Sequence, residues 1–228
     1  MIPRIVIAAS WAGLIALDFT GFGPWMVAQP MVCGPLFGWL MGQLSVGVIL
    51  GGIAQLLWID VTPVGVGIPY DSTAVTLLAV YWAALPAHSS LSQIVLALFI
   101  AVPFGFLFRV MDFYARRVNT AVVRGIEKVP DESLPAVLSF GILGGVVWTW
   151  LRYAATYAFS MWVGQKLWSY LAYSPRMTWK DQGLTMAVIM LPVAGMGVAL
   201  ELLLLEDPEG RLTSSLRYFK FSKDKESA

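Results

Sequence analysis

Apolar residues fill most of this chain in long runs that are separated by short polar breaks. The clearest runs cover 5–17, 46–59, 74–87, 91–108, 134–151, 153–172 and 183–205. Several of them approach the roughly 20 residues that an α-helix needs to cross the hydrocarbon core of a bilayer. The pattern therefore predicts an all-α polytopic membrane protein, with residues 1–205 as a single integral-membrane domain.

Glycines and polar residues interrupt the apolar pattern early in the chain. Five glycines follow a spacing of four, namely Gly34, Gly38 and Gly42, and then Gly47 with Gly51. Glycines four residues apart share one helix face and let a neighbouring helix approach closely. The segment 30–43 is too short to span a membrane by itself. We therefore expect a half-helix or re-entrant element there, which is stable only inside protein or beside a water-filled cavity.

A second break, 60-DVTPVGVGIPYDST-73, follows an apolar run and contains two carboxylates. Pro63 and Pro69 stop helices and remove backbone donors. Lipid cannot satisfy the freed backbone groups, so protein or water must do so. The alternative is an ordinary aqueous loop, but this segment carries little charge and lies between two apolar runs. Because ionisable groups inside membranes are costly and usually functional, we expect broken helices around a central polar site, as in transporters.

Charged residues are concentrated in two places, 109–133 and 206–228. The first is predicted to be an amphipathic cytoplasmic loop, and the second a charged C-terminal tail. Positive-inside bias places both in the cytoplasm. Three simple spans between them would put the tail on the other side. Either 134–151 or 153–172 is then non-spanning, or the two form one broken passage, and the sequence leaves these alternatives open.

The remaining composition excludes several functions. Hydrophobic residues make up 58% of the chain and charged residues 13%, with a net charge of +1, so no basic field exists to bind nucleic acid. The only histidine is His88, and no phosphate-binding, dinucleotide or nucleophile-elbow motif occurs. Asp18, Asp60 and Asp71 are widely spaced and give no sign of a catalytic pair. We expect no catalytic residue, metal or cofactor in this chain, and Cys33 is read as a packing residue.

Two blocks carry a resemblance to a known family. The first is 30-PMVCGPLFGWLMGQLSVGVILGGIAQLLWIDVTPVGVGIPYD-71, and the second comprises 151-LRYA-154, 171-LAYSP-175 and 182-QGLTMA-187. They resemble the integral-membrane IIC component (permease IIC) of the mannose/fructose/sorbose class of sugar phosphotransferase systems. The resemblance covers about 5–205. The chain looks like a diverged and C-terminally shortened member.

Four positions depart from the family's pattern. Gln29 replaces an arginine, Gln43 replaces the acid of a Gly-Asp turn, and Gln55 replaces the glutamate of an "LE" element. Tyr70-Asp71 stands for the family's Pro-Asp, so Asp71 keeps the acid. The family's remaining apolar sequence after Leu205 is replaced here by the charged tail.

The resemblance implies a function and a set of partners. In the family, the IIC component has no phosphorylated residue, soluble A-type and B-type subunits relay the phosphoryl group, and the IIC component forms the sugar pathway with a D-type membrane subunit in an elevator-like unit. This chain is therefore expected to translocate a hexose-like sugar in the bacterial cytoplasmic (inner) membrane, with a D-type partner, as a homo-oligomer of C–D pairs. Amide and carboxylate groups can bind hydroxyls in bidentate fashion. The expected substrate-binding residues are Gln29, Gln55, Asp60, Thr62, Asp71 and Ser72.

Two other functions stay open at this point. The changes to glutamine and the shortened C-terminus are also compatible with a diverged, non-transporting membrane scaffold or regulatory protein. A transporter of a small neutral solute, working without phosphorylation, is the other alternative.

Overall fold

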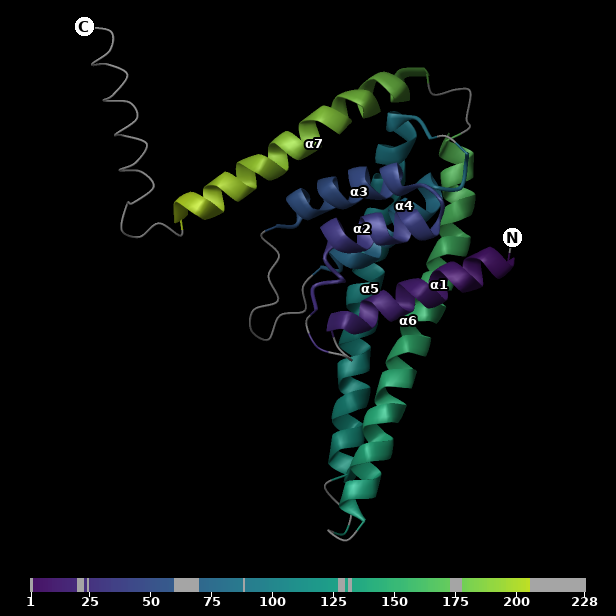
Figure 1. Ribbon diagram of the computed structural model, residues 1–228, viewed down its shortest axis with the longest axis vertical. Helices are drawn as coiled ribbons and strands as arrows, with labels where there is room; N and C mark the ends of the chain where they lie inside the picture. The colour runs from purple at the N-terminus through teal and green to yellow at the C-terminus, as the bar shows by residue number, and fades with distance from the viewer. Residues whose placement is uncertain are drawn as a thin grey trace, which may run out of the picture.

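The computed structural model describes residues 2–19, 23, 25–59, 70–87, 89–126, 130, 133–172 and 178–205, and these contain helices and no strand. The helices are α1 (Ile2–Ala16), η1 (Leu17–Phe19), α2 (Pro30–Leu40), α3 (Leu44–Leu57), α4 (Ser72–Ala83), α5 (Leu91–Ile126), α6 (Leu134–Ala172) and α7 (Thr178–Leu205). Figure 1 shows α1 to α4 gathered around the upper parts of α5 and α6. His88 and the tail 206–228 lie outside the described residues.

The short helix α4 forms the centre of the molecule. Every residue from Ala74 to Ala83 is buried, and α4 packs against α1, α2, α3, α5 and α6. A helix that is apolar on all sides is stable only when other elements or lipid surround it completely. The indole of Trp82 lies against Gly164 of α6 and donates to the carbonyl of Met161 at 3.2 Å. This packing contact and hydrogen bond join α4 to α6.

Helices α2 and α3 form a tight hairpin through glycines. A Cβ atom added to Gly34 would lie 2.7 Å from both the Gly47 carbonyl oxygen and the Gly51 Cα, and one added to Gly38 would lie 2.7 Å from the Gly47 Cα. The small-residue face predicted from the spacing is therefore used within this chain. The remaining glycine of the series, Gly42, has a φ of 81° and follows the end of α2. The Gln43 N–H donates to the Gly38 carbonyl at 2.7 Å.

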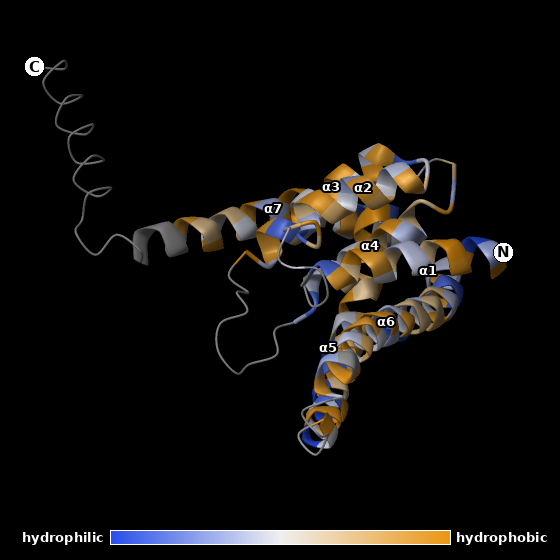
Figure 2. Ribbon diagram, turned by 60° about the horizontal axis from the view of Figure 1, so that its bottom comes forward, coloured by the Kyte–Doolittle hydropathy of each residue, from blue (hydrophilic) through white to orange (hydrophobic). Residues whose placement is uncertain are grey.

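The N-terminal and C-terminal helices cover opposite parts of this body (Figure 1). Helix α1 lies on α6, where Gly13 faces Ala154 and the Trp150 indole donates to the Ser10 carbonyl at 3.2 Å. Helix α7 packs against α3 and α5, with Gly195 against Leu56. Figure 2 shows hydrophobic residues on several sides of the short helices, as expected for helices surrounded by protein and lipid.

The long helices α5 and α6 extend further than the separate apolar runs indicate. Residues 109–126, expected as an amphipathic helix within the charged loop, continue α5 without interruption, and 134–172 forms one helix rather than two segments or a broken passage. The two helices project together from the body as a hairpin in both views (Figures 1 and 2). We call residues 109–126 of α5 and 134–151 of α6 the α5–α6 arm. Helix propagation through these residues is sterically unhindered, because neither stretch has a proline beyond the first turn.

Among the residues that the structure describes, three helices are long and apolar enough to cross a membrane, with windows in Leu91–Ile126, Val137–Ala172 and Gln182–Leu200. The helices α1, α2, α3 and α4 are apolar but shorter. An 11-residue helix such as α2 extends only about 17 Å, which is roughly half of the hydrocarbon thickness. The predicted all-α polytopic membrane protein with half-helices is thereby confirmed.

Candidate functional site

The N-terminal ends of α2 and α4 lie beside the last turn of α3. Thr73, in the first turn of α4, donates from its Oγ1 to the carbonyl of Ala28 at 2.6 Å, just before α2 begins. The Met31 N–H, in the first turn of α2, donates to the Gln55 Oε1 of α3 at 3.3 Å. These contacts bring three helix ends together. We call Gln29, Gln55, Asp71, Ser72 and Thr73 the helix-end site.

Two of the predicted residues shape the α2 side of this site. Gln29 precedes α2 in an extended conformation, and its carbonyl accepts from the Val32 and Cys33 N–H groups, both at 2.8 Å. Its side chain makes no capping hydrogen bond to α2, and the residue is exposed. Gln55, in the last turn of α3, is half-buried. Both residues are therefore at least partly accessible from outside the protein.

Asp71 is the N-cap of α4. Its Oδ1 accepts from the Ala74 N–H at 2.8 Å, which satisfies one of the free donors of the first turn. The N-terminal ends of α2 and α4 both carry partial positive charge, which favours a carboxylate there. Ser72 is half-buried beside it, and its carbonyl accepts from the Thr76 hydroxyl at 2.8 Å. Asp71 thus has a structural role as well as its proposed role in binding.

An aromatic pair flanks the break between α3 and α4. The rings of Trp58 and Tyr70 stack with centroids 5.5 Å apart and an interplanar angle of 16°. The Tyr70 hydroxyl donates to the Val102 carbonyl of α5, and its ring lies on Gly105. The two ends of the break are therefore held to each other and to α5. Asp60 and Thr62 lie between them, outside the described residues.

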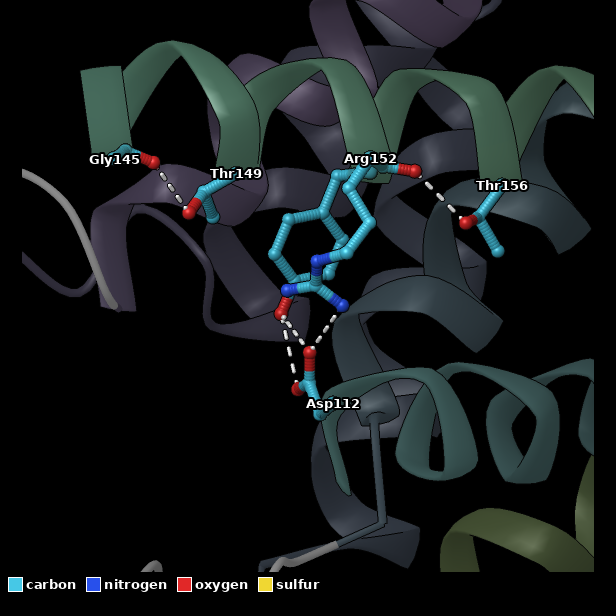
Figure 3. Close-up of polar contacts among 6 residues, drawn as sticks. Asp112, Gly145, Thr149, Arg152 and Thr156 are labelled. Atoms are coloured by element: carbon cyan, nitrogen blue, oxygen red, sulfur yellow. Dashed lines mark hydrogen bonds and ion pairs between the residues drawn. The ribbon is translucent and has the colours of Figure 1, made fainter. Parts of the chain in front are cut away.

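A second polar group joins α5 and α6 (Figure 3). Arg152 Nη1 lies 2.8 Å from Asp112 Oδ1, and the Tyr153 hydroxyl is 3.0 Å from both Asp112 carboxylate oxygens. The Arg152 guanidinium also lies over the Tyr153 ring, 4.4 Å from its centroid.

The part of α6 that follows Arg152 along the chain carries further polar atoms. Tyr157 and Ser160 are completely buried, and Tyr157 packs on Phe108 with ring centroids 4.5 Å apart. Among the described residues, the Tyr157 hydroxyl, the Ser160 hydroxyl and the Arg152 Nε have no hydrogen-bond partner. Buried polar atoms without partners are costly and are usually met by water or a ligand. This face extends the polar interior beyond the residues predicted from the sequence.

Two other polar residues have structural roles instead. Asp18 is buried and accepts from the Trp25 N–H at 3.1 Å and the Ala28 N–H at 3.0 Å, which shapes the segment before α2. Gln43 donates through its amide to the carbonyls of Pro86 and Ala87, at 2.5 and 2.8 Å. A carboxylate could not donate these bonds. The glutamine in place of the family's acid therefore links the turn between α2 and α3 to the turn after α4. It does not face the helix-end site.

Sequence reasoning missed the α5–α6 polar group. Asp112 belongs to the segment that the charge pattern assigns to a loop, and Tyr157 and Ser160 lie within an apolar run where nothing marks their orientation. A signal existed in Arg152, which interrupts that apolar run and follows the hydrophobic stretch 134–151. An arginine in such a position usually faces the protein interior and has a carboxylate partner.

Comparisons with known proteins agree with these observations. The family model described as the sorbose-specific IIC component of the PTS system, the sugar phosphotransferase system, matches residues 2–207. A structure described as "Structure of membrane protein" superimposes with a TM-score of 0.71 at 17% identity, covering 97% of this chain and 85% of that chain. A complex of the mannose transporter ManYZ with microcin E492 superimposes with a TM-score of 0.60, also at 17% identity, covering 98% of this chain and 85% of that one. None of the curated proteins matches the chain.

The fold and site define a multi-pass membrane protein with short, interrupted helices around a polar interior. The chain belongs to the family of sorbose-specific IIC components of the phosphotransferase system, the mannose class of sugar permeases.

Proposed function

We propose that this chain is the C-type subunit of a phosphoenolpyruvate-dependent sugar permease and that it helps to carry a hexose-like sugar across the bacterial cytoplasmic membrane. The observation that supports this most directly is the meeting of three helix ends at Gln29, Gln55 and Asp71. In transporters, substrate sites are commonly built where interrupted helices end inside the membrane.

The residues at these ends have the chemistry that a sugar requires. An amide both donates to and accepts from neighbouring hydroxyls, and a carboxylate accepts two hydroxyl hydrogens. Hydrogen bonds to the charged Asp71 are the stronger ones, roughly twice as strong as neutral bonds. Gln55 and Gln29 then fix the orientation of the sugar. We include Asp60, Thr62 and Ser72 in the proposed site, because they border the break that begins after α3.

The proposed function also requires other subunits. A D-type membrane subunit would complete the sugar pathway, and soluble A-type and B-type subunits would supply the phosphoryl group. The solved structure of the mannose transporter ManYZ shares this fold. We propose pairs of C-type and D-type subunits that assemble into a homo-oligomer.

The test is uptake of labelled hexoses into proteoliposomes that contain this chain and its D-type partner. We expect uptake and phosphorylation only when phosphoenolpyruvate, the general phosphotransfer proteins and the A-type and B-type subunits are present inside. Uptake without phosphorylation would instead show a transporter of the uncoupled kind. If a correctly assembled complex bound no sugar and transported none, the chain would be a scaffold derived from this family.

A second function has a specific observation in its favour. Gln29 and Gln55 place neutral amides where the family has an arginine and a glutamate, so this site carries fewer charges than its relatives. A small neutral solute that is carried without phosphorylation would also suit such a site. The same uptake assay, carried out with polyols beside hexoses and with and without phosphoenolpyruvate, separates the two functions.

A further inference from the structure

Four arginines form a stripe along the α5 part of the α5–α6 arm. Arg109, Arg116, Arg117 and Arg124 are all exposed. Their spacings of 7, 8 and 15 residues from the first place them on one side of the helix. Within the part of the chain that the structure describes, none of the four pairs with a carboxylate, because the single acid on this stretch, Asp112, pairs with Arg152. Arg117 lies over the Phe113 ring, 4.4 Å from its centroid.

The neighbouring helix of the arm is the opposite in character. Residues 134–151 of α6 contain no charged residue, and most of them are exposed. Phe140, Ile142 and Leu143 have 78%, 69% and 64% of their surface accessible. Three glycines on this stretch, Gly141, Gly144 and Gly145, have at most one side-chain atom near them. This apolar surface needs lipid or protein around it.

The two helices of the arm turn different faces outward. On α5, the half-buried positions Met111, Asp112, Ala115 and Ile126 face α6, and the Ile126 side chain reaches Gly141. By helical geometry, the arginine stripe lies on roughly the opposite side of α5. The arm therefore has an apolar side, provided by α6, and a cationic side, provided by α5.

Such an arm fits neither bulk solvent nor the middle of a bilayer. In water it would expose the apolar face of α6, and in hydrocarbon it would bury four arginine charges. At the boundary between the two, α6 can face the acyl chains while α5 faces the headgroups, as amphipathic interfacial helices do.

We propose that the arginine stripe of α5 is a binding surface for the headgroups of anionic phospholipids, with α6 of the arm immersed in the adjacent acyl layer. A row of guanidinium groups complements the negative surface of a membrane leaflet, and the long arginine stems can lie along apolar groups while their charges stay in the headgroup layer. This surface is separate from the helix-end site and does not depend on the proposed transport function.

The first test measures lipid retention by the full-length protein. The purified protein is incubated in mild detergent with equal amounts of phosphatidylglycerol and phosphatidylcholine, and bound lipid is counted by native mass spectrometry. We expect preferential retention of phosphatidylglycerol. The variant with Arg109→Gln, Arg116→Gln, Arg117→Gln and Arg124→Gln should lose this preference by roughly tenfold or more, because each basic residue contributes a severalfold effect.

Two matched variants separate charge from other causes. The same four positions changed to lysine should keep the preference, because the charge remains. Lys166→Gln, which neutralises an exposed base of α6 outside the arm, should also keep it. Equal retention of the two lipids by the wild type, or unchanged retention by the glutamine variant, would overturn the proposal. Displacement of the lipid by millimolar inorganic phosphate, or loss of a co-purified acidic protein in place of lipid, would also do so.

The second test measures depth in otherwise wild-type protein. Nitroxides are attached at Thr120→Cys, between the arginines, and at Phe140→Cys, on the apolar side. The native Cys33 is completely buried and therefore should not compete for the label. In phosphatidylglycerol liposomes we expect oxygen to broaden the Phe140 label and a water-soluble nickel chelate to broaden the Thr120 label. Two labels with the same accessibility profile would contradict the proposed arrangement.

Discussion

Asp71 combines two roles that substitutions can separate. Its carboxylate caps α4, and in the proposed function it also binds the sugar. Asparagine caps helices about as well as aspartate, so Asp71→Asn keeps the cap and removes the charge. We expect about tenfold weaker sugar binding with unchanged thermal stability, because hydrogen bonds to an ionised acceptor are the stronger ones. Binding is measured by titration calorimetry of the assembled complex.

The companion variants decide what a loss of binding means. Asp71→Ala should lose binding and also about 1 kcal/mol of stability, since the cap is removed. Gln55→Leu should weaken binding, whereas Gln43→Leu should lower stability without changing the affinity of the folded protein. If Asp71→Asn and Gln55→Leu both bound sugar normally, the helix-end site would be a structural junction only.

Gly47 gives a sharper prediction about packing. A Cβ atom there would lie 2.9 Å from the Gly38 Cα and closer still to the Gly34 carbonyl oxygen, and both neighbours are backbone. Gly47→Ala should therefore destabilise the protein by about 1–3 kcal/mol, the usual range for overpacking. The control is Gly52→Ala on the same helix, because nothing lies within 4 Å of a Cβ atom at that position.

Thermal unfolding followed by size-exclusion chromatography in detergent gives both values. The two alanines have the same intrinsic helix propensity, so the difference between the variants reports the α2–α3 contact alone. Equal melting temperatures for the two variants would mean that the hairpin opens readily.

At the scale of elements, one ion pair contributes to the contact between α5 and α6. Arg152 and Asp112 are both largely shielded from solvent, with side-chain exposures of 12% and 25%. Removal of one partner leaves an uncompensated charge, so Arg152→Met should cost about 2 kcal/mol or more. The double variant Arg152→Met with Asp112→Leu should regain most of this loss. A double-mutant cycle on unfolding free energies measures the coupling, and additive losses would show that the pair does not couple the helices.

The elements also show what the sequence could and could not predict. Half-helices around 30–43, the close glycine contact and the break after α3 followed directly from helix length, glycine spacing and proline positions. The extents of α5 and α6 did not, because arginines and a Gly-rich stretch weaken a hydropathy signal without stopping a helix. Asp112 and Arg152 lie 40 positions apart in the chain, and no periodicity reports a contact of that separation. For the site, the family resemblance supplied Gln55 and Asp71, and only the three-dimensional structure could add Tyr157.

At the scale of the whole molecule, the single helix α6 changes the expected topology. With α6 and α7 as the helices between the two charged segments, both segments return to one side of the membrane if each helix crosses once. This agrees with the positive-inside expectation for 109–133 and 206–228, which three separate spans would contradict. The orientation itself stays a prediction.

Cysteine labelling in intact cells tests this orientation. Asn119→Cys, on α5 of the arm, should be protected from a membrane-impermeant thiol reagent, because the basic residues around it belong on the cytoplasmic side. Ser90→Cys is the matched control, since it is exposed at the other end of α5 and should react from outside. The reverse labelling pattern would show that the protein has the opposite orientation in the membrane.

The uninterrupted course of α6 from body to arm has a mechanical consequence. The 18 residues from Leu134 to the Asp112–Arg152 contact span about 27 Å of helix. If the body rotated by about 10° around that contact while α6 stayed straight, the tip of the arm would sweep through about 5 Å. The helix would then act as a lever whose fulcrum is an ion pair. Any displacement of the polar interior would be magnified at the lipid boundary, and distances between spin labels on α4 and at the tip would register it.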